Sequence, residues 1–378
     1  ICPAPCEKSC VLSIHRAPVT IRENEAAALE MAFNEGFIHP QPPTHRTGKR
    51  VAVIGSGPAG LAVANQLNKK GHDVTVYEKS SHVGGLLRLG IPDFKLNKNV
   101  IDRRIKLMEA EGIKFVTNTE VGKDIKGKDL LKNNDAVCVA IGSQVPRNLP
   151  IEGRDLQGVY YAMEYLSIQN KLVAKEEVPA NEIINAKGKN VLVIGGGDTG
   201  SDCIGTANRQ GAANILQIEI LPKPKKLEDI ENPWPEPYPI VLKTSSSHLE
   251  GCERRWSVNT KRFIGEDGKL TAVELVEIAW EKDEKGNHIM KEVGEPEILK
   301  IDLVFLALGF VHPIQEGLLA ELNLDVDGRK NVATDAKRAT NVAKVFGAGD
   351  CVSGQSLVVK CIASGREPAK HIHDFLKA

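Results

Sequence analysis

Two copies of one hydrophobic pattern organise this chain of 378 residues. Each copy has a short apolar run, a glycine-rich turn, an amphipathic stretch and a second apolar run, and the copies cover residues 51–78 and 191–221. Short apolar runs bounded by glycine are typical of strands buried on both faces of a parallel sheet, and the stretch between them is typical of a helix. The pattern therefore predicts an α/β fold with two doubly wound dinucleotide-binding domains, whose glycine turns start at Gly55 and Gly195.

Smaller apolar runs predict where the chain passes from one domain to the other. Runs that end in small residues, at 137–143 and 303–310, are typical of chain crossings between two such domains. A strand-like run at 345–350 and an apolar helix-like stretch from Leu357 indicate that the end of the chain completes the first domain. We therefore expect a first domain at 49–150 and 309–378, a second domain at 151–308, and residues 1–48 outside both.

The first glycine turn has the residues that a dinucleotide pyrophosphate needs. Gly55, Gly57 and Gly60 follow an apolar strand and open a helix, so that unpaired helix N–H groups can face a phosphate. Glu78 closes the following strand, where a carboxylate can accept both hydroxyls of an adenosine ribose. Tight packing alone also produces glycine turns, but the strand, the helix and the acidic residue together favour a nucleotide site.

The second glycine turn repeats this arrangement with Gly195, Gly197 and Gly200, and Glu219 stands where Glu78 stands in the first copy. A carboxylate there favours a free ribose diol and repels a 2′-phosphate, so we expect NADH rather than NADPH. Basic residues just downstream, which are more often a solvated loop, could instead reach a phosphate: Lys223, Lys225 and Lys226.

The end of the chain indicates that the first domain binds a flavin. Asp350 follows the apolar run at 345–350, where its carboxylate could hold a ribityl chain or simply cap a turn. If residues 354–356 begin the next helix, its positive end can sit at the flavin pyrimidine and stabilise the reduced ring. The two features together favour FAD in the first domain and NADH or NADPH in the second.

The sequence offers no other obvious chemistry. Residues 84–88 read GGLLR at the place where disulfide reductases of this architecture carry a CxxxxC pair. We also find no Ser-His-Asp set and no HExxH motif. Hydride transfer between nicotinamide and flavin needs none of these groups, so we expect an oxidoreductase without a catalytic side chain.

Composition excludes several classes of partner. The chain has 49 basic and 49 acidic residues, so no net field attracts nucleic acid or an anionic membrane. No apolar run approaches the roughly 20 residues of a membrane-spanning helix. The eight cysteines do not form a disulfide framework, which fits the reducing cytoplasm. The chain starts at Ile1 without the pattern of a signal peptide, and we expect that sequence upstream of it is missing.

Three cysteines lie close together at the start of the chain. A helical pattern near Glu25–Phe37 and then a proline-rich connector at 39–49 separate them from the first domain. Cys2, Cys6 and Cys10 are spaced in a way that suits an iron-sulfur cluster or zinc. Three ligands are one short of a closed site, so free cysteines in a frayed terminus are the alternative.

Long stretches of the sequence resemble the glutamate synthase small (beta) subunit family across nearly the whole chain. The resemblance is carried by ICPAPCEKSCV, RTGKRVAVIGSGPAGLA, GGLLRLGIPDFKLNKNVIDRRI, AMEYLSIQNK, VIGGGDTGSDC, NPWPEPYP, TSSSHLEGCERRWSV and GAGDCVSGQSLVV. Runs of this length are far more specific than a glycine fingerprint.

The resemblance implies the residues of both cofactor sites and the nature of the cysteine cluster. Residues 1–48 would be the end of a helical domain that binds low-potential [4Fe-4S] clusters, with Cys2, Cys6 and Cys10 as the last part of the ligand set. The nicotinamide cofactor would contact Gly195, Gly197, Asp198, Thr199, Gly200 and Glu219. The FAD would contact Gly55, Gly57, Pro58, Ala59, Gly60, Glu78, Lys79, Gly85, Leu86, Arg88, Ile141, Gly142, Gly309, Gly349, Asp350, Gln355, Ser356 and Leu357.

The resemblance also implies the reaction and the partner. Hydride would pass from NAD(P)H to FAD, and electrons would leave singly through the clusters to a large (alpha) subunit or a fused equivalent that makes glutamate from glutamine and 2-oxoglutarate. A ferredoxin-linked or other flavin and iron-sulfur oxidoreductase built on the same subunit type is the alternative. The chain departs from the family where Val352, Ser353, Lys360 and Cys361 replace commoner residues, and it lacks the double arginine of NADPH-using members after the second strand.

Overall fold

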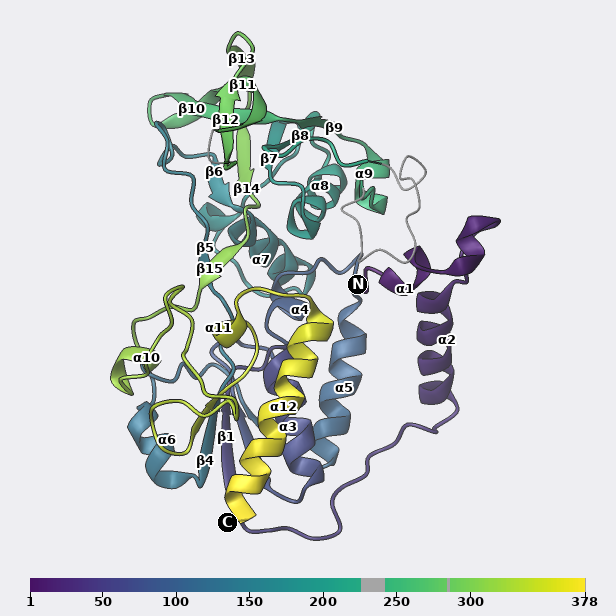
Figure 1. The fold of residues 1–378 in the computed structure, drawn as a ribbon, viewed down its shortest axis with the longest axis vertical. Coiled ribbons are helices and arrows are strands. Elements are labelled where there is room, and N and C mark those ends of the chain that lie inside the picture. Colours follow the sequence, from purple (N-terminus) through teal and green to yellow (C-terminus); the bar gives the residue numbers. More distant parts are fainter. Residues whose placement is uncertain (226–241, 284–285, 378) are drawn as a thin grey trace.

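The computed structural model describes residues 1–225, 242–283 and 286–377, and it has two lobes and an N-terminal arm (Figure 1). The lower lobe contains a five-stranded parallel sheet of order β16-β4-β1-β2-β3. Its strands are β1 (Arg50–Ile54), β2 (Asp73–Tyr77), β3 (Lys114–Val116), β4 (Ala136–Val139) and β16 (Val345–Gly347). Strand β16 therefore brings the end of the chain back to the first sheet.

Both faces of this sheet are covered, which explains why β1 is apolar from Val51 to Ile54. Val51 and Val53 pack on one face, against α3 (Pro58–Lys69), α5 (Lys98–Ala110) and α12 (Val358–Lys377). Ala52 and Ile54 pack on the other face, against α6 (Gly127–Asn133) and α10 (Leu318–Glu321). Successive strand residues point to opposite faces, so two separate apolar cores result. The lower lobe also contains the short helices α4 (Leu86–Leu89) and α11 (Asp350–Ser353).

The upper lobe repeats the parallel sheet, in the order β6-β14-β7-β8-β9. Its strands are β6 (Val159–Tyr161), β7 (Asn190–Ile194), β8 (Asn214–Glu219), β9 (Glu253–Trp256) and β14 (Leu303–Leu306). Helices α7 (Ala162–Val173) and α8 (Asp198–Gln210) cover one face, and α9 (Ser246–Glu250) packs on α8. A 3₁₀ turn, η2, covers Ala180–Glu182.

An antiparallel sheet covers the other face of the upper parallel sheet. The repeated pattern of apolar runs and glycine turns does not predict it. Strands β10 (Val258–Glu266), β11 (Lys269–Lys282), β12 (His288–Glu292) and β13 (Glu297–Lys300) form it around β11. Phe263 and Leu275 from this sheet pack on Leu192 and Ile218 of the parallel sheet.

The two lobes are joined by a short antiparallel pair, β5 (Val145–Pro146) and β15 (Phe310–His312). The apolar runs expected to be crossings, 137–143 and 303–310, contain β4 and β14, which are buried parallel strands. The crossings themselves follow those strands. The expectation therefore placed each crossing one element too early in the chain, because a buried strand and a crossing strand have the same apolar composition.

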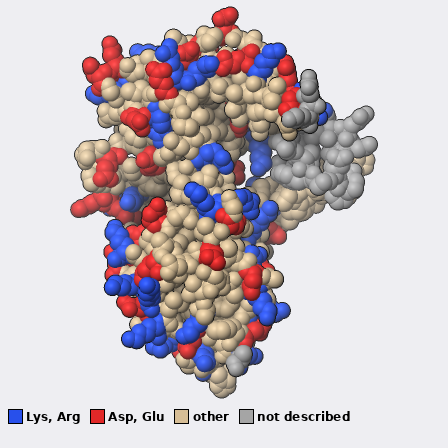
Figure 2. Space-filling model, turned by 60° about the vertical axis from the view of Figure 1, so that its left-hand side comes forward, with Lys and Arg blue, Asp and Glu red and all other residues tan. Residues whose placement is uncertain are grey.

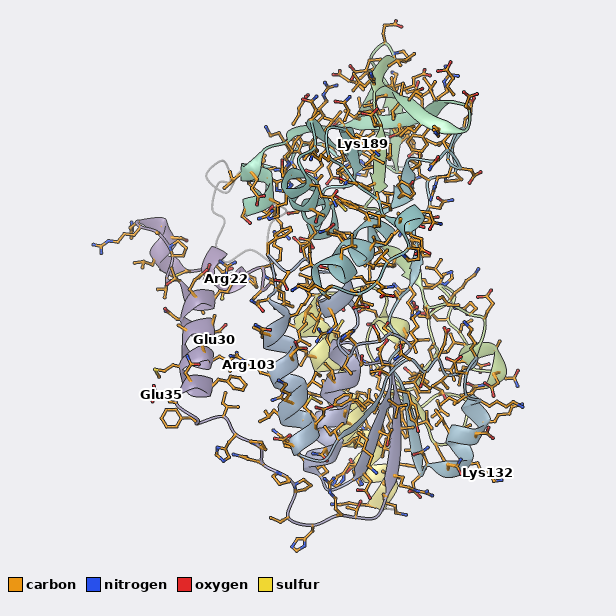
Figure 3. All side chains as sticks on the ribbon, turned by 180° about the vertical axis from the view of Figure 1, so that it is seen from behind. Arg22, Glu30, Glu35, Arg103, Lys132 and Lys189 are labelled. Atoms are coloured by element: carbon orange, nitrogen blue, oxygen red, sulfur yellow. The ribbon has the colours of Figure 1, made fainter. Side chains whose placement is uncertain are left out.

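The N-terminal arm lies beside the lower lobe. It contains α1 (Pro5–Lys8), the 3₁₀ turn η1 (Val11–Ile14) and α2 (Ile21–Asn34). Helix α2 starts earlier than the pattern near Glu25–Phe37 predicts. Figure 3 shows Arg103 of α5 reaching toward Glu30, and its guanidinium also lies 3.9 Å from the centroid of the Phe33 ring.

Lysine, arginine and acidic side chains occur together on both lobes of the face in Figure 2, which agrees with the balanced charge of the sequence. Among the described residues, no helix combines the length and apolarity that crossing a membrane would need.

Candidate functional site

A cavity of about 700 Å³ opens at the carboxyl ends of the first sheet's strands. This volume is typical of a cofactor site, and this edge of an open α/β sheet is where such ligands bind. Most of the residues predicted for FAD line it: Gly55, Gly57, Pro58, Ala59, Glu78, Lys79, Gly85, Leu86, Ile141, Gly142, Asp350 and Ser356.

The turn between β1 and α3 is built so that its backbone faces this cavity. A side chain at Gly60 would overlap the carbonyl oxygen of Gly55, so glycine there allows the helix to pack tightly on the strand. A side chain at Gly57 would meet nothing within 4 Å, and no side chain caps the helix that starts at Pro58. The first N–H groups of α3 therefore face open space, which fits a pyrophosphate.

Glu78 lines the cavity and is almost fully buried, with 6% of its surface exposed. Its carboxylate accepts hydrogen bonds from the Ser56 N–H at 3.1 Å and the Ser80 N–H at 2.9 Å, and also from the Ser56 hydroxyl. These donors hold the carboxylate in place at the end of β2. It can therefore accept ribose hydroxyls without rearrangement.

Asp350 also lines the cavity. Its Oδ1 accepts hydrogen bonds from the Ser356 hydroxyl at 2.8 Å and from the Cys361 thiol at 3.1 Å. Burial raises the pKa of Cys361 to about 12, so this thiol stays protonated and donates. Helix α12 begins at Val358, and residues 354–356 precede it, contrary to the expectation that they start it. Gly354 has a positive φ of 81°, which ends α11 and delays the next helix.

The remaining predicted flavin residues do not line the cavity, and several support its walls. The Arg88 guanidinium donates to the Val83 carbonyl and pairs with Asp102. The Gln355 amide packs on Gly309, and its oxygen accepts the Phe310 N–H at 2.8 Å. The others outside the lining are Gly60, Gly349, whose Cα faces Ala59, and Leu357.

The cavity also has a wall that the sequence did not indicate. Met163 and Ser167 of α7, in the upper lobe, contribute to the lining, as do Phe310 and Ile314 beside the crossing strand. These residues belong to no glycine motif, because only the packing of the two lobes brings them to the cavity. One end of the cavity thus faces the second glycine turn's domain.

The second glycine turn has the construction of the first. A side chain at Gly200 would overlap the Gly195 carbonyl, one at Gly197 would meet nothing, and no side chain caps α8. Asp198 and Thr199 form the first turn of α8, outside the described cavity of the lower lobe.

Glu219 closes β8 and lies directly over Gly196, where any side chain would overlap its carboxylate. Burial raises the pKa of Glu219, while Arg254 and a hydrogen bond from the Gly196 N–H act in the opposite direction. The Glu219 carboxylate therefore lies against the second glycine turn, at Gly196, as the Glu78 carboxylate lies against the first glycine turn, at Ser56. Lys223 lies 4.9 Å from the Trp256 ring, whereas Lys226 and the NPWPEPYP stretch fall outside the described residues.

The three candidate metal ligands are not gathered. Cys2 and Cys6 are exposed and Cys10 is partly exposed, and the described residues contain no set of three His, Cys, Asp or Glu side chains placed to hold a metal. Backbone N–H groups of Val19 and Leu12 lower the pKa of Cys10, which favours its thiolate form. The described arm by itself does not fit a closed cluster site, so we derive no electron-transfer step through it.

Comparison with known proteins identifies the family. A profile of the pyridine nucleotide-disulphide oxidoreductases matches residues 49–365. The glutamate synthase [NADPH] small chain of Mycobacterium tuberculosis is 46% identical over 379 residues, which cover all of this chain and 77% of that protein. The chain belongs to the glutamate synthase small-chain family. The resemblance read from the sequence is thereby confirmed.

Some relatives are much longer than this chain. The glutamate synthase [NADH] of Schizosaccharomyces pombe is 48% identical over 98% of this chain, but the chain spans only 18% of that protein. Among solved structures, Mycobacterium tuberculosis FprA in complex with NADPH has a TM-score of 0.69 and 18% identity, covering 87% of this chain and 85% of the other. Thioredoxin reductase of T. acidophilum has a TM-score of 0.60. These likenesses confirm the predicted fold of two dinucleotide-binding domains.

Proposed function

We propose that this small-chain family member is the NAD(P)H-oxidising, FAD-binding electron-input part of a glutamate synthase. The observation that carries the proposal is the pair of uncapped glycine turns, one of which opens into a 700 Å³ cavity that residues of both lobes line. The flavin domain would comprise residues 49–150 and 309–378, and the nicotinamide domain residues 151–308.

Each described group has a role in this proposal. The N-terminal end of α3 would bind the FAD pyrophosphate, Glu78 its adenosine ribose, and Asp350 its ribityl hydroxyls. When bound, the flavin would accept hydride from the nicotinamide ring and release electrons singly. The chain binds and orients the two cofactors and excludes water between them, which is how positioning lowers the barrier.

We propose NADH as the preferred reductant. Glu219 occupies the position of a ribose-binding carboxylate, and a 2′-phosphate there would meet its negative charge. Arg254 faces the same carboxylate, but its Nε already donates to Gln217 and its Nη1 to the Lys243 carbonyl. The relatives do not decide the question, since those named for NADH and for NADPH are similarly close.

Anaerobic reduction of the bound flavin tests the proposal. Adding NADH to the FAD-loaded protein should bleach the oxidised flavin absorbance. The Asp350→Ala variant should bind FAD more weakly, and the exposed Lys132→Met variant should behave as the wild type. If neither NADH nor NADPH bleaches the flavin, the proposed activity is refuted.

The electron acceptor would be a glutamate synthase large subunit or a fused equivalent, in the cytoplasm. Cys2, Cys6 and Cys10 would be part of the ligand set of a [4Fe-4S] cluster, a set that these three residues do not complete. Support comes from the relatives, among which small chains and longer synthases both occur. A pull-down that recovers a large amidotransferase-type protein supports this acceptor, and recovery of ferredoxin alone contradicts it. Iron and acid-labile sulfide after anaerobic reconstitution, compared with a Cys6→Ala variant, test the cluster.

A further inference from the structure

The two chain segments that cross between the lobes are short. Strands β5 and β15 contribute two and three residues, and they pair through Phe310 with Pro146 and His312 with Val145. Domains joined in this way move relative to each other unless a further interface prevents it. Hydride transfer, in contrast, needs the reacting atoms of the two rings held about 3–3.5 Å apart, and a misplacement of about 1 Å can slow it about a hundredfold.

One segment of the lower lobe provides such an interface. We call residues 84–97 the bridging segment; it begins at the cavity, where Leu86, Leu89 and Ile91 form part of the wall. The Asn170 side-chain amide of α7 donates to the Leu89 carbonyl at 2.9 Å. The flavin cavity and the upper lobe therefore share this stretch of backbone.

The bridging segment continues onto α8, the helix of the second glycine turn. A methyl group at position 205 of α8 would lie 2.8 Å from the Phe94 ring, so glycine there lets the ring approach the helix. The Arg209 guanidinium lies 3.6 Å from the centroid of the same ring. The Lys95 ammonium lies 3.5 Å from the Ser201 hydroxyl and 4.0 Å from the Asp202 carboxylate.

The segment is held rigid from its own lobe. The Lys98 ammonium of α5 donates to the carbonyls of Ile91 at 2.6 Å and Leu96 at 3.1 Å. The Lys95 N–H donates to the Pro92 carbonyl at 2.9 Å. A lysine that donates to two carbonyls of one turn fixes the shape of that turn. Helix α8 therefore cannot move relative to the lower lobe by a change in the shape of this turn alone.

The contact is placed where it matters for the nicotinamide. Ser201 and Asp202 lie on the first two turns of α8, just beyond the uncapped end at Gly197. Side-chain exposure is 23% for Lys95 and 12% for Asp202, so water screens the pair only weakly. Burial raises the pKa of Asp202 to about 7, and Lys95 is the strongest charge acting against that rise.

We propose that the bridging segment fixes the nicotinamide helix α8 relative to the flavin cavity, and that Lys95 is its positioning residue. The purpose of this fixation rests on the proposed hydride transfer, but the contact itself does not. Lys95 would act through α8 and would not touch either cofactor.

Hydrogen exchange tests the contact without any cofactor chemistry. In the Lys95→Met variant, the amides of residues 86–97 and 198–210 should exchange about tenfold faster than in the wild type. Lys95→Arg should restore most of the protection, and the exposed Lys132→Met should change nothing. Unchanged exchange in Lys95→Met, with the variant folded, overturns the proposal.

Flavin reduction by NADH then separates positioning from binding. The limiting rate at saturating NADH should fall about tenfold to a hundredfold in Lys95→Met, the cost of a misplacement near 1 Å, while the half-saturating concentration changes less than about twofold. A rise in the half-saturating concentration alone means that Lys95 binds the dinucleotide directly, and overturns the positioning role. If the wild type fails to reduce its flavin, the proposed function fails, whereas the exchange result still stands.

Discussion

The choice between NADH and NADPH depends on one carboxylate, and changing it should change the preference. The perturbation is Glu219→Gln, which keeps an oxygen to accept the Gly196 N–H but removes the negative charge. Two unit charges 4 Å apart near a protein surface repel by about 4 kcal/mol at an effective dielectric constant of about 20. Arg254 faces the same site and offsets part of this repulsion. We therefore expect about 2 kcal/mol, or roughly a thirtyfold rise in the NADPH-to-NADH rate ratio.

The assay is anaerobic stopped-flow reduction of the bound flavin, with the second-order rate constant measured for each cofactor. Glu266→Gln, an exposed carboxylate at the end of β10 in the same lobe, is the matched control and should leave the ratio unchanged. Because burial raises the pKa of Glu219, its charge is lost at a higher pH than that of an ordinary glutamate, so the wild-type preference for NADH should shrink toward acid pH. A wild type that already prefers NADPH, or a Glu219→Gln ratio within about twofold of the wild type, would refute the reasoning.

Three further perturbations test other parts of the structure. Gly57→Ala should leave the flavin-free protein as stable as the wild type, because the added methyl group would meet no atom within 4 Å. It should weaken FAD binding about tenfold or more, measured by fluorescence titration, because the methyl group fills the space for the pyrophosphate. Burial lowers the pKa of His72 and of its hydrogen-bonded neighbour His373, so the unfolded chain binds more protons than the folded protein. The free energy of unfolding, measured with urea, should therefore fall as the pH drops below about 6.5. The His373→Gln variant should show a smaller fall. Arg103→Ala removes the ion pair with Glu30 of α2, and proteolysis of residues 21–34 should accelerate, by about fivefold at most because water screens an exposed pair, while flavin reduction is unaffected. Equal proteolysis would show that the arm is held elsewhere.

Local physics accounts for the parts of the fold that the sequence predicted. Each glycine turn is specified by its own residues, since Gly60 and Gly200 are required wherever a helix packs directly on the preceding turn. The apolar strands β1 and β7 are buried on both faces, and their composition shows it. These elements could therefore be predicted without knowledge of anything distant in the chain.

Element boundaries and the antiparallel sheet were less accessible. The start of α12 depends on the positive φ of Gly354, which a sequence pattern does not display. Strand β11 alternates buried and exposed residues over part of its length, as in Val273 and Leu275, and this period was the available signal for the missed sheet. Its partner strands β12 and β13 are almost entirely exposed and carry no such signal.

The cavity shows most clearly where prediction from motifs stops. Asp350 could be found because it closely follows a strand, but Met163 lines the same cavity from another lobe and has no motif. Arg88 and Gln355 occupy stretches that resemble the family, yet they hold the backbone around the cavity instead of lining it. A stretch that resembles the family thus contains two kinds of residue: those placed to touch a ligand and those that hold the first kind in position. Lys95 lies in such a run, and only its distance to α8 shows which kind of residue it is.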